Sequence, residues 1–350
     1  MSVARAHMSA LAQSRHANVF VWWPSQPEII ACFNAGTVAE VTAQTWVRWI
    51  TMILHTSGEL IVRRVTVAEG SEAFQYRLIE GATLGESDAL SPGDYVCVYT
   101  DRTRRYWRSP FQAYNFGTLA HSKNVWERES PNAADFRLEE YIIPEALKNE
   151  AARRDGGRCV LTGSSSGNKT EVVVNWIFPS AHIHYTQAPT LYAGTSSEAI
   201  DVFRVSANLM TMRADLYELW HSNAFSIDVD DGYRMRIFDE SALNVGLPER
   251  LDGPRQEWDM FIREHFHYTL IVRVAGGDIG EDYDPATVQA FKESMGLDAT
   301  EGIVQLDLSD AVWKTPMGAE VLEHELAWRA KRQALPGNDG AAIPTNQTSG

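Results

Sequence analysis

Short runs of β-branched and aromatic side chains, separated by turn-forming residues, dominate the first hundred positions of the chain. The runs at 18–24, 59–67 and 95–99 have the length and composition of strands. Between them, the apolar positions of 38–54 fit neither the helical nor the strand period, so this segment is either a helix or two strands. The pattern predicts a β-rich domain over 18–130.

Helical patterns predominate later in the chain. Pro144 suits the first turn of a helix, and the strong helix formers of 145–154 continue it until Gly156 and Gly157 follow. A second helix is expected at 321–333. The scattered aromatics and turn formers between these patterns, from Ser109 to Ala134, predict a linker or a long loop.

Apolar residues recur at three- and four-residue steps from Trp258 to Leu270, which predicts a core helix. His265 and His267 lie within it. Residues two apart on a helix face different directions, so this pair is interpreted as part of the core and not as a metal site.

These patterns together predict an α+β fold with two main domains. The expected organisation is a flexible N-terminus (1–17), a β-rich domain (18–130), a mixed domain (136–275), a C-terminal helical extension (276–334) and a disordered tail (335–350).

The composition describes an acidic chain of 350 residues with a net charge of -15 and 44% hydrophobic residues. The negative charge disfavours nucleic acid as a partner, because affinity for phosphates comes from Lys and Arg. A basic cluster, Arg102 to Arg108 with Tyr106 and Trp107 inside it, is interpreted as a solvated turn. A small molecule or a protein remains open as the partner.

The chain lacks an apolar run long enough to span a membrane and a signal-peptide pattern at its start, so an intracellular location without a membrane partner is expected. Cys32, Cys97 and Cys159 are odd in number and far apart, which indicates neither a disulfide framework nor a thiolate zinc site.

Three segments, 153–163, 172–179 and 208–221, together resemble an HNH nuclease module of the branch common in fungal proteins, with a lone Cys and a Thr-Gly upstream. The resemblance extends over 136–275. It implies a ββα unit that binds one divalent cation: a His on the first strand activates water, an Asn braces that His, and a His on the helix holds the metal.

This chain departs from the family at two of those three positions. Trp176 stands where the family has the base, and an indole cannot accept a proton. Asn208 is retained as the middle Asn. Tyr217 stands where the helix His is expected, and a neutral phenol is a poor metal ligand. The resemblance therefore predicts the scaffold of a nuclease with doubtful activity.

Three histidines offer a substitute metal site. His182 and His184 would point to the same side of a strand, and His221 lies one helical turn after Tyr217. Together they could bind zinc, manganese or iron. The alternative is a surface loop with incidental histidines.

Three functions therefore compete. The first is a diverged HNH-like protein without efficient phosphodiesterase activity, with a binding or structural role. The second is a divalent-metal nuclease that uses the relocated histidines. The third is an enzyme of small-molecule (secondary) metabolism whose pocket is walled by the aromatic residues Trp176, Tyr185, Tyr217 and Trp220.

Overall fold

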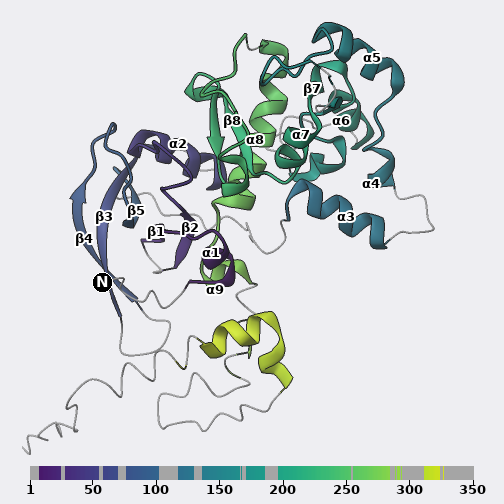
Figure 1. Cartoon of the computed structure of the whole chain (residues 1–350). Coiled ribbons are helices and arrows are strands. Elements are labelled where there is room, and N and C mark those ends of the chain that lie inside the picture. Colours follow the sequence, from purple (N-terminus) through teal and green to yellow (C-terminus); the bar gives the residue numbers. More distant parts are fainter. Residues whose placement is uncertain are drawn as a thin grey trace, which may run out of the picture.

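The computed structural model has the expected α+β fold, with a mixed sheet and α-helices at one end and a strand-strand-helix region at the other (Figure 1). The residues that the structure describes are 8–24, 28–54, 58–69, 76–101, 117–129, 136–165, 167, 171–185, 196–253, 255–283, 288, 290, 291, 293, 311–323 and 326.

The β-rich half is built on a five-stranded sheet of order β2-β1-β5-β3-β4. β1 pairs parallel with β5, and the other neighbours pair antiparallel. The three expected strand segments are present as β1, β3 and β5. The strands are β1 (Val19–Trp22), β2 (Ile29–Phe33), β3 (Leu60–Glu69), β4 (Tyr76–Thr83) and β5 (Gly93–Tyr99).

The segment that sequence left open is a helix, α2 (Ala43–Leu54). Thr42 caps it, because its hydroxyl accepts a hydrogen bond from the backbone N–H of Thr45 at 3.2 Å. Trp46, Trp49, Ile50 and Ile53 are its large buried side chains, at three- and four-residue steps. Val47, an apolar residue that is only partly buried, stands between these positions and interrupts the helical period in the sequence.

Both faces of the sheet are covered, which explains why β1 and β2 are apolar at every position. α2 packs on one face, while the short helix α1 (Ala10–Ser14) places Ala12 against the other. The flexible N-terminus expected over 1–17 is wrong from Met8 onward, because these residues are ordered around α1. Ser9 caps α1 and donates a hydrogen bond to the buried carboxylate of Asp282.

The other half contains a strand-strand-helix unit and a second hairpin. β6 and β7 pair antiparallel and α7 follows β7 directly. α5 is the helix expected after Pro144, with the same bounds. The elements are α5 (Glu145–Arg154), β6 (Val172–Trp176), α6 (Ser196–Phe203), β7 (Leu209–Arg213), α7 (Ala214–His221), β8 (Phe225–Asp228) and β9 (Arg234–Ile237).

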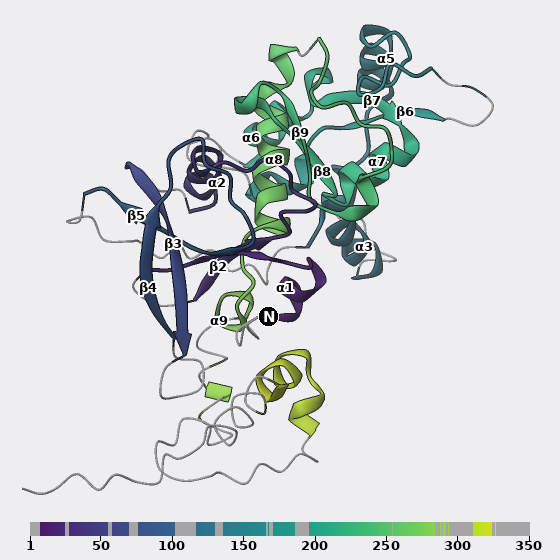
Figure 2. The same ribbon diagram turned by 60° about the vertical axis from the view of Figure 1, so that its left-hand side comes forward.

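The expected core helix is α8 (Asp259–Arg273), and it contacts both α2 and β8 (Figure 2). Phe261 and Ile262 belong to the core of the mixed half, whereas Phe266 and Leu270 belong to the core beneath the sheet. The two halves therefore share one helix, and the core continues across the boundary predicted near residue 130.

Part of the predicted linker is a helix, α3 (Leu119–Glu129), whereas 109–116 and 130–134 lie outside the described residues. The sequence did not indicate this helix because Leu119 and Trp126 are the only buried positions of α3, so the hydrophobic period of the segment is weak. A further short helix, α4 (Phe136–Glu139), precedes α5.

The C-terminal extension includes α9 (Ile279–Asp282) and helical residues 316–323, so the helix predicted from 321 begins earlier. The expected tail, 335–350, lies outside the described residues. Within the part of the chain that the structure describes, no helix combines the length and apolarity needed to cross a membrane.

Candidate functional site

Trp176, at the position of the expected base, is a buried end residue of β6 with 2% of its surface exposed. Its indole N–H donates to the backbone carbonyl of Tyr141 at 3.0 Å. The side chain thus links β6 to the segment before α5. An indole is only a donor, so this position offers no atom that could accept a proton from water.

Asn208 is fully buried, and every polar atom of its amide is bonded to backbone. Its Nδ2 donates to the carbonyls of Phe178 and Phe203, at 2.7 and 2.8 Å. Its Oδ1 accepts from the N–H of Phe178 at 3.1 Å. Asn208 therefore fixes the chain that leaves β6, and no amide group remains to orient a catalytic side chain.

Tyr217, at the position of the helix histidine, lies on α7 one turn before His221, as the spacing predicted. The two rings are stacked, with centroids 5.3 Å apart and planes 12° from parallel. Burial raises the pKa of Tyr217, which keeps it a neutral phenol.

His182 and His221 meet at a residue that the sequence did not point to, Tyr141. The Tyr141 hydroxyl lies 3.2 Å from Nδ1 of His182 and 3.3 Å from Nε2 of His221. The same hydroxyl also lies 3.4 Å from the Leu119 carbonyl, which can only accept. The hydroxyl can therefore donate to this carbonyl and accept hydrogen bonds from the two imidazoles, which links the three side chains. These three residues are called the Tyr141 cluster below. Tyr141 belongs to no motif, and its role arises only from tertiary contact.

The strand predicted for His182 and His184 is wrong. Ser180–Tyr185 is a 3₁₀ helix, whose three-residue turn does not place alternate residues on one side. The His182 N–H donates to the Pro179 carbonyl, three residues earlier, at 3.0 Å, which is the hydrogen bond expected of such a turn. The His184 side chain lies outside the described residues, as does that of Tyr185.

Aromatic rings enclose the Tyr141 cluster and remove it from water. The His182 ring, which is 0% exposed, lies 5.0 Å from the Trp126 ring and 5.5 Å from the Tyr268 ring, measured between centroids. Burial, with a smaller contribution from nearby His221, lowers the pKa of His182 to about 3. Burial, with a smaller contribution from Lys123, lowers the pKa of His221 to about 4. Both imidazoles are neutral at pH 7.

The pKa of Tyr141 is raised well above its ordinary value, mainly by burial. Two imidazoles can ligate a metal in their neutral form, but the third group here is a neutral phenol, which is a poor ligand, so the cluster supplies too few ligands for a divalent cation. Among the described residues, no group of three or more His, Cys, Asp and Glu side chains is placed to hold a metal ion. The site residues that are described therefore do not fit the cation implied by the resemblance.

His265 has a structural role, in agreement with the interpretation from its spacing. Its ring stacks on Trp220 with centroids 3.6 Å apart, and its Nε2 lies 3.0 Å from the Trp220 carbonyl. A carbonyl can only accept, so Nε2 carries the proton and Nδ1 accepts from the Ser226 hydroxyl at 2.8 Å. Burial lowers the pKa of His265 to about 3.

Of the basic residues near the module, Arg154 is also structural. Its guanidinium donates to the carbonyls of Ser206 and Leu209 and lies over the Trp258 ring. The basic cluster at 102–108 lies outside the described residues.

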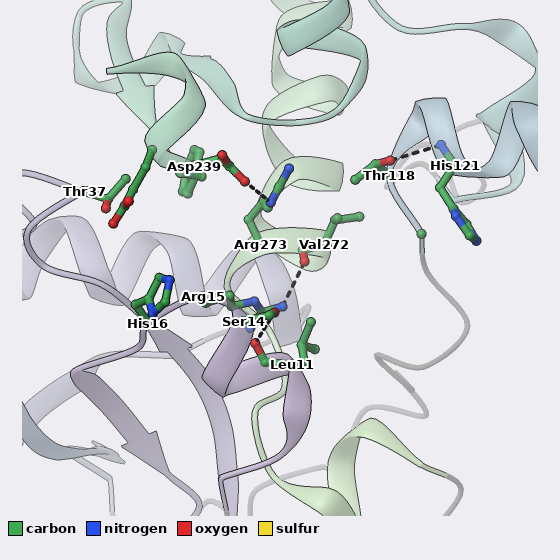
Figure 3. Close-up of a pocket in the computed structure, with 13 residues that line it drawn as sticks. Leu11, Ser14, Arg15, His16, Thr37, Thr118, His121, Asp239, Val272 and Arg273 are labelled. Carbon is green, nitrogen blue, oxygen red and sulfur yellow. Dashed lines mark hydrogen bonds and ion pairs between the residues drawn. The ribbon is translucent and has the colours of Figure 1, made fainter. Parts of the chain in front are cut away.

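A cleft of ≈ 500 Å³ opens away from the Tyr141 cluster, between α1, the start of α3 and the end of α8 (Figure 3). Its lining shares no residue with that cluster. Arg15 and Arg273 lie centrally, His16 lies on one side, and His121 lies on the other. Sequence reasoning missed these residues because they come from segments more than a hundred positions apart.

No protein-family model, curated protein or solved structure matches this chain. The chemistry of the Tyr141 cluster and of the cleft is therefore the basis for inferring function.

Proposed function

We propose that this chain is a diverged HNH-like protein without efficient phosphodiesterase activity, which has a binding or structural role. The observation that carries the proposal is the Tyr141 cluster. Its phenol is hydrogen-bonded to both imidazoles that could otherwise bind a cation. A metal ion would have to displace that hydroxyl from two nitrogen atoms inside an aromatic enclosure.

The position of the base gives independent support. Trp176 is buried, and its N–H is already bonded to the Tyr141 carbonyl. Loss of general-base assistance reduces a rate by about 10² to 10⁴. The side chain that replaced the base now stabilises the segment that carries Tyr141, which is a structural use of the position.

Asn208 supports the same proposal, because it is retained but bonded elsewhere. In the family the corresponding Asn braces the base. Here the amide bonds only to Phe178 and Phe203. These hydrogen bonds fix the segment that follows β6, which gives Asn208 a structural role without a catalytic one.

The test is a cleavage assay combined with a metal measurement. The purified full chain is incubated with supercoiled plasmid and with bis(p-nitrophenyl) phosphate, in Mg²⁺, Mn²⁺, Zn²⁺ or Ni²⁺. We expect no hydrolysis above the protein-free reaction with any cation. Elemental mass spectrometry of the protein should find far less than one equivalent of transition metal.

A matched variant, His221→Gln, separates this proposal from the nuclease alternative. Glutamine retains a donor and an acceptor but is a weak ligand for zinc-like metals. Cation-dependent cleavage, or about one equivalent of metal, that is lost in His221→Gln would refute the proposal. Such a result would favour the divalent-metal nuclease with relocated histidines.

A further inference from the structure

The cleft between α1, α3 and α8 contains Arg15, whose guanidinium forms no ion pair with the described residues. Arg15 follows α1, and its guanidinium donates to the carbonyls of Val272 at 2.9 Å and Val274 at 3.2 Å. Its buried Nε atom has no hydrogen-bond partner. Among the described residues, no carboxylate lies within ion-pair distance of Arg15. Nη1 also contacts Cys32 Sγ at 3.5 Å. The buried Asp282 carboxylate acts on Arg15 from beyond ion-pair distance, so these partners orient the guanidinium without forming an ion pair with it.

The second arginine of the cleft differs, because Arg273 is fully paired. It binds Asp239 at 2.7 Å and donates to the carbonyls of Asn223 and Ser222, at 3.1 and 2.7 Å. Asp239 is therefore occupied by Arg273 and is not free to balance Arg15. The remaining carboxylate of the lining, Glu240, is exposed to solvent.

Two exposed imidazoles flank these arginines from opposite sides, His16 next to Thr37 and His121 next to Thr118 (Figure 3). Neither imidazole makes a hydrogen bond within the part of the chain that the structure describes. An imidazole can donate a hydrogen bond to an anion in its neutral or its charged form. The cleft thus presents donors from three directions around one unpaired charge.

We propose that this cleft binds a small molecule through a carboxylate or phosphate group, with Arg15 as its charge partner and His16 and His121 as flanking donors. The volume of ≈ 500 Å³ lies within the range of small-molecule sites, roughly 300 to 1,000 Å³. The exposed Glu240 in the lining, together with the net charge of -15, disfavours a polyanion such as nucleic acid. This site does not depend on the nuclease resemblance, and its test leaves the Tyr141 cluster unchanged.

The test is isothermal titration of the full chain with citrate and, separately, with inorganic phosphate, at fixed ionic strength. We expect saturable binding of at least one anion. His121→Gln should weaken it about threefold, as expected for the loss of one exposed contact to an anion. His16→Asn should act in the same direction, and asparagine tolerates the positive φ of 47° at this position.

Two further variants separate a site from general electrostatic attraction. Arg128→Gln removes a positive charge from the same helix as His121 but outside the cleft, and should leave the affinity unchanged. Glu240→Gln should strengthen binding, because it removes a negative charge from the lining. Binding of citrate alone assigns a carboxylate ligand, and binding of phosphate alone assigns a phosphate ligand. The proposal is overturned if neither anion binds saturably, if Glu240→Gln weakens binding, or if Arg128→Gln weakens it as much as His121→Gln.

Discussion

Arg48 on α2 and Asp228 at the end of β8 form a bidentate ion pair, in which Arg48 Nη2 lies 2.6 Å from Asp228 Oδ2. The Asp228 side chain is only 1% exposed, and it also accepts a hydrogen bond from the Trp49 indole at 3.2 Å. The pair joins the β-rich half to the mixed half at the point where α8 contacts both. Because the charges lie inside a shared core, the two halves are expected to unfold together.

Replacing Arg48 with methionine should therefore destabilise the whole chain. The variant keeps the apolar stem but leaves the buried Asp228 carboxylate with the Trp49 indole as hydrogen-bond donor and the more distant Arg236, at 3.7 Å, as its positive charge. We expect the free energy of unfolding to fall by about 3 kcal/mol, as for other broken buried pairs. Urea unfolding followed by tryptophan fluorescence measures this change.

The matched control is Arg63→Met, which removes the partner of Glu80 in an ion pair between β3 and β4. Glu80 is 56% exposed, so this loss should be about 1 kcal/mol or less. Equal effects of the two variants would show that the Arg48 pair is no stronger than a surface pair. Two separate unfolding transitions in the wild type would contradict the shared core.

Tyr141→Phe tests the hydrogen bonds of the Tyr141 cluster. The variant preserves the ring among Trp126, His182 and His221 but leaves both imidazoles without the hydroxyl. We expect a loss of about 1 to 3 kcal/mol in the free energy of unfolding, because buried polar groups lose their partner. Urea unfolding and the imidazole NMR signals of His182 and His221 should both respond.

Tyr217→Phe provides the control for this change. Tyr217 contacts the same cluster through ring stacking on His221, and phenylalanine keeps that contact. Its loss of stability should be below about 0.5 kcal/mol. If Tyr141→Phe were equally mild, hydrogen bonding through the Tyr141 hydroxyl would not be what holds the cluster together.

Elements whose own sequence has a clear hydrophobic pattern could be predicted, whereas elements held by tertiary contacts could not. β1, β3, β5, α5 and α8 were predictable because each has a clear run or period of its own. α3 was not, since its sequence shows little amphipathic pattern, and it is held by contacts such as the Leu119 N–H with the Asn223 side chain.

The candidate site shows the same division. The four-residue spacing of Tyr217 and His221 predicted that they share one face of a helix, because helical geometry depends only on local sequence. The meeting of His182 with His221 at Tyr141 joins a 3₁₀ helix, a helix end and the segment before α5. No pattern in a single sequence encodes a contact across such separations, so Tyr141 could not be named in advance.

Acid should destabilise this protein well above the pH at which ordinary carboxylates titrate. Folding lowers the pKa of His182 and His265 to about 3 and that of His221 to about 4, from roughly 6.5 in an unfolded chain. Between about pH 6 and pH 4 the unfolded chain therefore binds protons that the folded chain does not. Stability falls as the pH decreases through this window.

Asp282 acts in the opposite direction. Burial raises its pKa to about 6, from roughly 3.9 unfolded, so the folded chain binds this proton first and gains stability as the pH falls. Three imidazoles oppose one carboxyl, which leaves about two uncompensated protons near pH 5. Each contributes about 1.4 kcal/mol per pH unit at most.

Urea unfolding at pH 7, 6 and 5 should therefore show a steep loss of stability that increases toward pH 5. Asp282→Asn should make this slope steeper, because the opposing proton is removed. His265→Gln should make it shallower, because the variant no longer has an imidazole that must stay neutral between Trp220 and Ser226. A stability that is constant or rising from pH 7 to pH 5 would mean that these imidazoles are not buried in their neutral form. Slopes that the two variants leave unchanged would assign the acid sensitivity to other groups.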